Sequence, residues 1–322
     1  MKTKSKIVAV ALASSFAFAT LMAGSAHAVT PARHDGGGGG GGFAVRCEFS
    51  HTDNVDPIVM PGKKMVSHSH KFFGNTTTDE NSTGASLLAG NSTCEDPNNL
   101  SAYWVPALYQ DGIEVDPIRV KVRYGALRGE VTAFPNGFMA LTGKSDDTAR
   151  WGCQVRGQRP IYTSSAANVP TCTGTEHLVA EIIFGECWDG ASLDSADHRS
   201  HLANSERVGM GRSQCPSTHP VRVPRVSVEV EYPQQARGGS GITLASGAAS
   251  TLHADIFEAW VSDSLQAKIN ESSGQRQQGP RGNDGQANGQ RQQGPRGNQT
   301  NRPARAAQPT QQEPNQSTPV PA

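Results

Sequence analysis

Two segments of the chain alternate apolar and polar residues with a period of two, IRVKVRYG at residues 118–125 and RVSVEVEY at residues 225–232. Successive side chains of a strand point to opposite faces, so this alternation predicts strands with one face in a core and the other in water. The segment HLVAEIIFGECW, residues 177–188, is more continuously apolar and suits a buried strand. Turn-forming pairs such as PG, DG, NG and GG recur between such segments. The pattern predicts a mainly β fold, an antiparallel β-sandwich with long loops and few short helices, for which a jelly roll is one candidate topology.

Composition limits how much of the chain can form this fold. Residues 29–42 include seven consecutive glycines, which predict a flexible Gly-rich leader. Residues 271–322 are rich in Gln, Gly, Arg and Pro, and the sequence GQRQQGPRGN occurs there twice, so we predict a disordered tail. Residues 43–270 remain as one predicted domain of about 230 residues, enough for a single well-packed core.

The N-terminus predicts export. Residues 1–28 have the form of a signal peptide, with Lys2, Lys4 and Lys6 before an apolar stretch and the cleavage-type sequence AHA at residues 26–28. No later segment approaches the roughly 20 apolar residues that a membrane-spanning helix requires. We therefore expect a secreted, extracellular protein without a membrane span.

The cysteines agree with an oxidising compartment. Six cysteines, an even number, follow the predicted signal peptide, and none forms a CxxC pair, so three disulfides are expected. Six cysteines allow 15 connectivities, and the sequence does not choose among them. Pairing of sequence neighbours would join Cys153 to Cys172 in a loop of about 20 residues, which stabilises by about 3 kcal/mol in the chain-entropy model. The cysteines are Cys47, Cys94, Cys153, Cys172, Cys187 and Cys215.

Charge argues against one class of partner. The whole chain has 29 basic and 29 acidic residues, but residues 29–270 hold 20 basic and 26 acidic ones. Nucleic-acid binding depends on clustered Lys and Arg, so we expect no nucleic-acid partner for this acidic domain. We also expect it to be a monomer.

Three short motifs gather histidine and aspartate. In SHSH two histidines are two residues apart, so on a strand both side chains would leave the same face. In CWDGASLDSADHRSHLA two histidines are three apart, which suits a helical turn or tight loop. In HADIFEAW a histidine and an aspartate are again two apart. The residues are His68 and His70, then His198 and His201 with Asp189, and then His253 with Asp255.

These residue types allow more than one role. Imidazole and carboxylate groups are ligands for divalent transition metals, and they also transfer protons near neutral pH. We expect the five histidines and Asp255 to converge in one solvent-accessible cleft, with Asp189 close by, and take all seven as candidate catalytic residues. His68, His70, His198 and His201 are the candidate metal ligands. A hydrogen-bonded structural network remains an alternative, since HxH also occurs often by chance.

The chain resembles a family of secreted proteins. The blocks DPIVMPG, SHSHKFFG, TC, SAYWVPALY, FPNGFMALTG, FGECWDGASLDSADHRSHLA, CPSTHPVRVP and HADIFEAW occur in one order across residues 43–262. This series resembles the fungal and bacterial domain-of-unknown-function family nineteen ninety-six. In fungi its members often accompany carbohydrate-binding WSC modules, which implies a wall or polysaccharide context. The resemblance carries Trp188 and the seven histidines and aspartates onto matching positions.

Three classes of function follow. We favour action on, or binding of, an extracellular or cell-wall polysaccharide by hydrolase- or lyase-type chemistry. The alternatives are a metal-binding secreted protein without catalysis and a non-catalytic wall or matrix component. Aromatic side chains could stack on sugar rings, with core packing as the alternative role for them. The candidates are Tyr103, Trp104, Trp151, Trp188 and Trp260.

Overall fold

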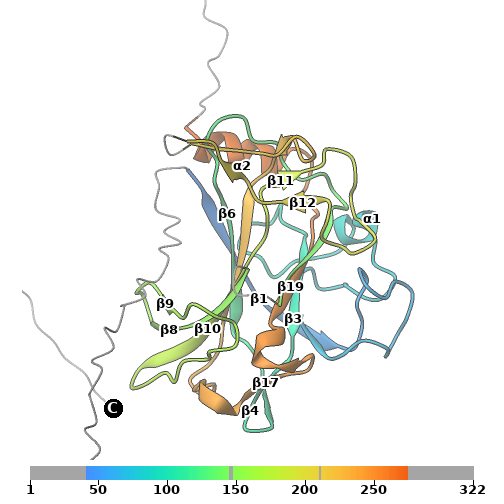
Figure 1. Cartoon of the computed structure of the whole chain (residues 1–322). Coiled ribbons are helices and arrows are strands. Elements are labelled where there is room, and N and C mark those ends of the chain that lie inside the picture. Colours follow the sequence, from blue (N-terminus) through green and yellow to red (C-terminus); the bar gives the residue numbers. More distant parts are fainter. Residues whose placement is uncertain (1–40, 145–147, 210–211, 275–322) are drawn as a thin grey trace, which may run out of the picture. The chain divides into compact units, whose positions relative to one another are not determined.

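The computed structural model describes residues 41–144, 148–209 and 212–274, and these residues form the predicted mainly β fold (Figure 1). The predicted signal peptide, nearly all of the leader and nearly all of the tail lie outside the described residues. No helix in the described part of the chain is long and apolar enough to cross a membrane.

One antiparallel sheet of ten strands dominates the fold. Its central strand, β1 (Phe43–Asp53), pairs with one neighbour through its first half and with the other through its second half, and its register shifts between Phe49 and His51. The sheet therefore curls there into two layers that face one shared core. In spatial order the strands are β7 (Met139–Gly143), β19 (His253–Phe257), β3 (Ala102–Pro106), β2 (His70–Gly74), β1, β6 (Arg119–Gly125), β16 (Arg225–Glu231), β10 (Glu176–Ile183), β8 (Ala149–Val155) and β9 (Ile161–Tyr162).

Smaller elements complete the domain. The short sheets contain β11 (Cys187–Trp188), β12 (Leu202–Ala203) and β15 (Val221–Arg222), then β13 (Glu206–Arg207) and β14 (Ser213–Gln214), and then β4 (Leu108–Gln110), β5 (Ile113–Val115), β17 (Ile242–Leu244) and β18 (Gly247–Ala248). The helices are α1 (Gly84–Leu88), α2 (Ser264–Ser272) and the 3-10 turns Gly239–Gly241 and Ala249–Thr251. The apolar segment predicted as one strand is divided between β10 and β11, because the chain turns at the buried Glu186, which binds Arg225.

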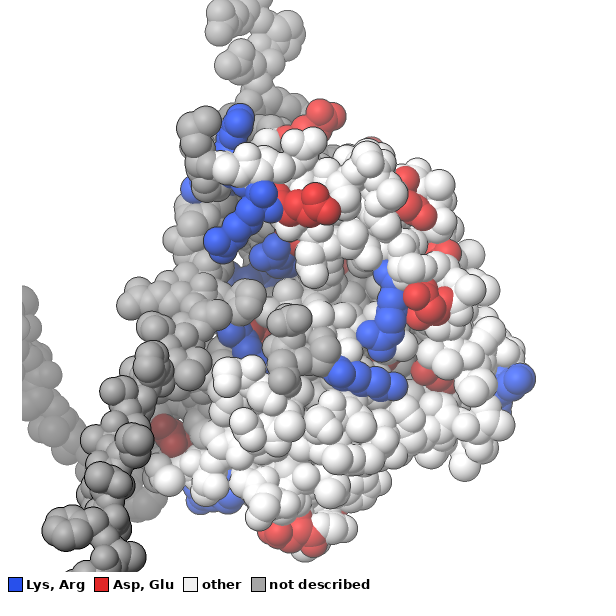
Figure 2. Space-filling view, viewed as in Figure 1, with Lys and Arg blue, Asp and Glu red and all other residues white. Residues whose placement is uncertain are grey.

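The alternating segments have the predicted two faces. On β6, Val120, Val122 and Tyr124 point into the core, whereas the residues between them face outward. On that outer face Lys121 binds Glu229 of β16 at 2.5 Å, and other cross-strand ion pairs lie beside it. Basic and acidic side chains are interspersed over the face seen in Figure 2.

Strands β2, β3 and β19 are different, because every residue in them is buried. One face of these strands lines the main core. The other carries Phe72 and Trp104 in a second apolar cluster that also includes Val55 and Ile58. Val55 and Ile58 belong to residues 54–69, which join β1 to β2 and are called the covering loop below. This doubly buried part of the sheet holds the candidate site.

Three disulfides join the six cysteines, as the sequence predicts, and no described cysteine is free. Their partners are Cys47–Cys94, Cys153–Cys172 and Cys187–Cys215, so the neighbour pairing expected for the second bond is confirmed.

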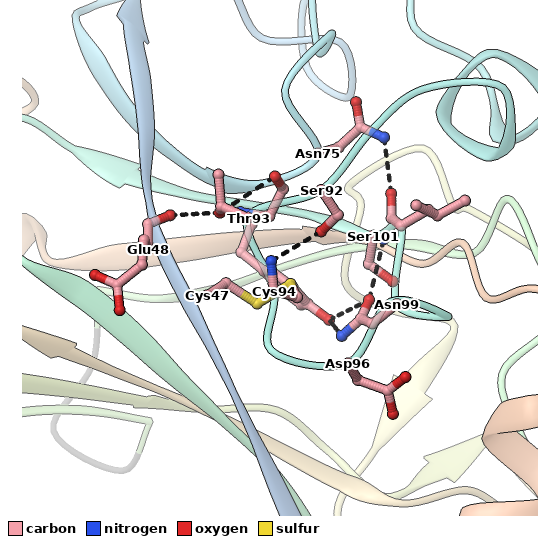
Figure 3. The surroundings of a disulfide bond; sticks show 12 residues. Cys47, Glu48, Asn75, Ser92, Thr93, Cys94, Asp96, Asn99 and Ser101 are labelled. Atoms are coloured by element: carbon pink, nitrogen blue, oxygen red, sulfur yellow. Dashed lines mark hydrogen bonds between the residues drawn. A yellow bond between two sulfur atoms is a disulfide. The ribbon is translucent and has the colours of Figure 1, made fainter.

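The first disulfide ties the connection between β2 and β3 to β1, and Figure 3 shows its surroundings. Beside the bond, the Thr93 hydroxyl donates to the Glu48 carbonyl at 2.6 Å. The buried Asn75 amide donates to the Leu100 carbonyl at 2.9 Å. These contacts hold the two ends of the connection and so fix how β2 and β3 enter the sheet.

A buried carboxyl group lies just beyond β19. Glu258 is fully buried and accepts hydrogen bonds from the Ser101 hydroxyl, the Tyr124 hydroxyl and the Trp260 indole, at 2.9–3.1 Å. Burial raises the pKa of Glu258 to about 7, although these hydrogen bonds act to lower it. The folded domain thus holds this proton more tightly than the unfolded chain does.

This predicts a pH-dependent loss of stability. Because the folded pKa is raised, the contribution of Glu258 is complete below the unfolded value near 4.5 and is lost as pH rises to about 7. The glutamine of Glu258→Gln does not titrate, so the variant serves as the reference. The wild-type protein should lose about 3 kcal/mol of unfolding free energy relative to this variant between pH 4.5 and 8. Urea unfolding of both proteins over this range measures the difference. A difference independent of pH would contradict the assignment.

Candidate metal centre

The floor of the site is a row of three residues on neighbouring strands. His70 of β2 pairs with Pro106 of β3, and the register between β3 and β19 places His253 opposite the same proline. The row therefore has an imidazole at each end and a proline between them. Both histidines are almost fully buried, with 0% and 3% of their surface exposed.

The next row has the same orientation. Phe72, Trp104 and Asp255 pair across the same three strands, two residues along from the first row. Side chains two apart on a strand share a face, so His70 and His253 lie on the face that carries the second apolar cluster. Asp255 is completely buried there.

The third histidine comes from the covering loop. His68 lies two residues before the start of β2, and its ring centroid is 4.2 Å from that of His70 and 5.3 Å from that of His253. Each of the three histidines offers one ring nitrogen, and these nitrogens all lie within 4.8 Å of one another. His68 is half-buried, whereas His70 and His253 are buried.

Backbone carbonyl groups set the tautomers of the two strand histidines. The Nδ1 atom of His70 lies 2.9 Å from the Val55 carbonyl, and that of His253 lies 2.7 Å from the Thr251 carbonyl. A carbonyl oxygen only accepts, so each Nδ1 carries the proton and each Nε2 has a free lone pair. Metal-binding histidines are usually oriented by such an outer hydrogen bond.

Unpaired polar atoms concentrate at this site. Nine buried side-chain nitrogen and oxygen atoms of the described residues have no hydrogen-bond partner, and five of them lie here. They are Nε2 of His68 and His70, Nε1 of Trp104 and both carboxyl oxygens of Asp255. A buried unpaired polar group costs about 1–3 kcal/mol, so five in one place indicate that a polar ligand completes the site.

The electrostatics keep the imidazoles uncharged. Burial lowers the pKa of His70 and of His68 to about 4, and that of His253 to about 3. The neighbouring His70 lowers that of His68 further. Burial also raises the pKa of Asp255 well above its ordinary value. The three histidines are therefore neutral at neutral pH, the state that binds a metal ion.

The dimensions suit a transition-metal ion. An ion equidistant from three nitrogens 4.8 Å apart would lie about 2.8 Å from each, whereas Zn–N bonds are about 2.0–2.1 Å. A contraction of less than about 1 Å therefore closes the site, and the loop position of His68 allows it. Neutral imidazole suits zinc, copper, iron and nickel.

Two predicted site residues have other partners. His201 binds the Ser195 hydroxyl through Nδ1 at 2.8 Å and the Met139 carbonyl through Nε2 at 2.7 Å, so neither nitrogen is free for a metal. Asp189 accepts the amides of Ala191 and Ser192, both at 2.9 Å, and closes a turn. Both residues shape residues 193–201, called the edge loop below, which runs along the free edge of β7.

His198 is bound to Asp194 and to β7. Its Nδ1 atom is 2.9 Å from Asp194, and its carbonyl accepts the Leu141 amide of β7 at 2.9 Å. Burial raises the pKa of Asp56 in the covering loop, and the imidazoles of His68 and His198 oppose this rise. The imidazoles of His68 and His198 thus both act to lower the pKa of the Asp56 carboxyl group.

Some of these partners could not be anticipated from local spacing. The carbonyl groups of Val55 and Thr251 have no residue-specific signal, and Asp56 is visible only as part of the DPIVMPG block. Four of the five aromatic candidates for sugar stacking are buried in the described domain, with 0–2% of their surface exposed, and only Trp188 is half-buried. Core packing is therefore their role here.

Two other cavities, of about 550 and 420 Å³, are lined by none of the seven predicted site residues. The first lies beside α2 and the second on the outer face of the large sheet. Neither contains the three-histidine cluster.

Fold and site together define a disulfide-linked, mainly β domain with a three-histidine candidate metal centre. The family model for a domain of unknown function, DUF1996, matches residues 56–260, which include all seven predicted site residues. The chain belongs to this family, as the ordered sequence blocks predict. No curated protein and no solved structure matches it.

The hydrogen bonds predict that replacing His201 lowers the stability of the domain much more than replacing His68. His201→Ala removes two buried hydrogen bonds and leaves the Met139 carbonyl unpaired, so the unfolding free energy should fall by about 1–3 kcal/mol. His68→Ala removes a half-buried ring without a hydrogen-bond partner among the described residues and should change it by less than about 0.5 kcal/mol. Urea unfolding with chelator present compares them. Equal losses would show that His68 is structural.

Proposed function

We propose that this domain binds one divalent transition-metal ion through Nε2 of His68, His70 and His253. The observation that carries the proposal is the set of three convergent, neutral imidazole nitrogens, two of which are buried without any hydrogen-bond partner. Sites with three protein ligands keep a position open for water or another ligand. The centre is therefore of the reactive type rather than a closed structural one.

Several features of the surroundings support this proposal. Trp104 Nε1 and Asp255 contribute an unpaired donor and two unpaired oxygens beside the cluster, which can bind groups attached to the ion. The disulfides and the predicted signal peptide favour loading and action outside the cell. The polysaccharide hypothesis rests on the family resemblance alone, because the buried aromatics offer little stacking surface.

Metal content tests the proposal directly. The purified full chain, stripped with chelator and reloaded with zinc or copper(II), should retain one equivalent of metal by elemental analysis. His70→Gln and His253→Gln should each lower the affinity at least about tenfold, since each removes one of three ligands. His177→Gln is the matched control, because its Nε2 is also buried and unpaired but lies outside the cluster. Equal retention by all three variants would contradict the proposal.

Metal removal should also lower stability. An ion that binds only the folded state adds about 4 kcal/mol to the unfolding free energy when its free concentration is about 1,000 times the Kd. Thermal unfolding with the ion and then with excess chelator should show this increment and its loss. The unfolding free energy of His253→Gln should be the same with the ion as with excess chelator. An increment of the same size in that variant would place the ion elsewhere.

A further inference from the structure

A second group of titratable side chains, a histidine–carboxylate pair, lies in the edge loop and is not part of the three-histidine cluster. Nδ1 of His198 lies 2.9 and 3.0 Å from the two carboxyl oxygens of Asp194. An ionised carboxylate only accepts, so Nδ1 carries the proton and Nε2 is left as an acceptor. Nε2 has no hydrogen-bond partner among the described residues, and the side chain is 20% exposed.

The backbone of His198 lies beside β7, the strand that neighbours β19. The His198 carbonyl accepts the amide of Leu141, and Leu141 pairs with Asp255. The row that contains Trp104 and Asp255 is thus extended through β7 to His198. The Arg199 side chain reaches the first row as well, because its guanidinium donates to the Gly143 carbonyl at 3.3 Å and Gly143 pairs with His253.

A carboxyl group of the covering loop interacts with both the pair and the cluster. The carboxyl group of Asp56 interacts electrostatically with the imidazoles of both His68 and His198. Its own position is fixed by the amides of Ile58 and Val59, which donate to it at 3.1 and 2.9 Å. The anchored carboxyl group of Asp56 thus interacts both with one imidazole of the cluster and with that of His198.

The backbone conformation of His198 is also unusual. Its φ angle of 59° lies in the left-handed region, which non-glycine residues seldom adopt. The Ser195 carbonyl, the Leu141 amide and the Asp194 carboxylate together hold it there. Such strained conformations persist where several surrounding contacts hold them in place, and they are enriched at functional sites.

We propose that His198, held by Asp194, is the proton acceptor of the metal centre, an inference that rests on the proposed metal binding. A water molecule on the open side of the ion loses one proton to Nε2 of His198, and the Asp194 carboxylate stabilises the imidazolium that forms. The hydroxide that remains is a nucleophile. The class of reaction that fits is hydrolysis or hydration, and neither needs an oxidant. The hydroxide oxygen bonds to an electrophilic carbon or phosphorus while the bond to a leaving group (hydrolysis) or a π bond (hydration) breaks, and the His198 imidazolium returns its proton to the group that takes the electron pair.

Cobalt(II) is the probe for this step, because its visible absorption reports the ionisation of water bound to it. The full chain is loaded with cobalt(II) and titrated from pH 5 to 9, together with His198→Asn and Asp194→Asn. Asparagine tolerates the left-handed conformation but does not accept a proton at this pH. We expect one equivalent of cobalt in every protein and a midpoint about one pH unit higher in His198→Asn. Asp194→Asn should show a smaller rise, and His177→Gln should titrate like wild type.

The outcomes separate the two proposals. Wild-type protein that binds no cobalt would contradict the metal site itself. Full cobalt binding with identical titrations in wild type and His198→Asn, or with no transition at all, would overturn the role of His198 and leave the metal site intact. Loss of cobalt from both His198→Asn and His198→Gln would make His198 a ligand or a structural residue and would also contradict the proposal.

Discussion

The cost of burying polar groups without partners governs this structure. Strands β2, β3 and β19 are covered on both faces, so water cannot solvate the polar side chains that they carry. Sandwich interiors in this position are ordinarily apolar, as the adjacent Phe72 and Trp104 side chains are. The chain instead places two histidines and an aspartate there, and no described residue pairs with Nε2 of His70 or with the carboxyl oxygens of Asp255. The metal ion that we propose would bind the unpaired nitrogen of His70 and offset part of this cost.

The three histidines of the cluster are held in different ways by the rest of the fold. His70 and His253 are fixed by strand pairing and by backbone carbonyl groups, whereas His68 is carried by the covering loop. The ligand set therefore has two preorganised members and one adjustable member, which can close on an ion and shield it. On the other side, His201 anchors the edge loop to β7, and this anchor positions His198. His201, with both ring nitrogens bonded to a serine hydroxyl and a backbone carbonyl, thus lies three residues from His198, which has a nitrogen unpaired among the described residues.

Local periodicity predicted much of this arrangement. Alternation identified β6 and β16, and the two-residue spacing placed His253 and Asp255 on one face. The same rule was incomplete for His68 and His70, because β2 begins at His70 and His68 reaches the cluster from the loop. The spacing of His198 and His201 predicted a shared position, but their hydrogen-bond partners differ, since these depend on how the edge loop meets β7. Contacts between residues more than 50 positions apart, such as His201 with Met139, have no local signal.

The most direct test of the central claim is the position of a bound ion in crystals of the zinc- or copper-loaded protein, located by anomalous scattering at the metal edge. We expect one fully occupied site with Nε2 of His68, His70 and His253 at about 2.0–2.1 Å from the ion. We also expect Nδ1 of His70 and His253 to keep their bonds to the Val55 and Thr251 carbonyls. An ion bound elsewhere, or an empty cluster in crystals that hold saturating metal, would contradict the account.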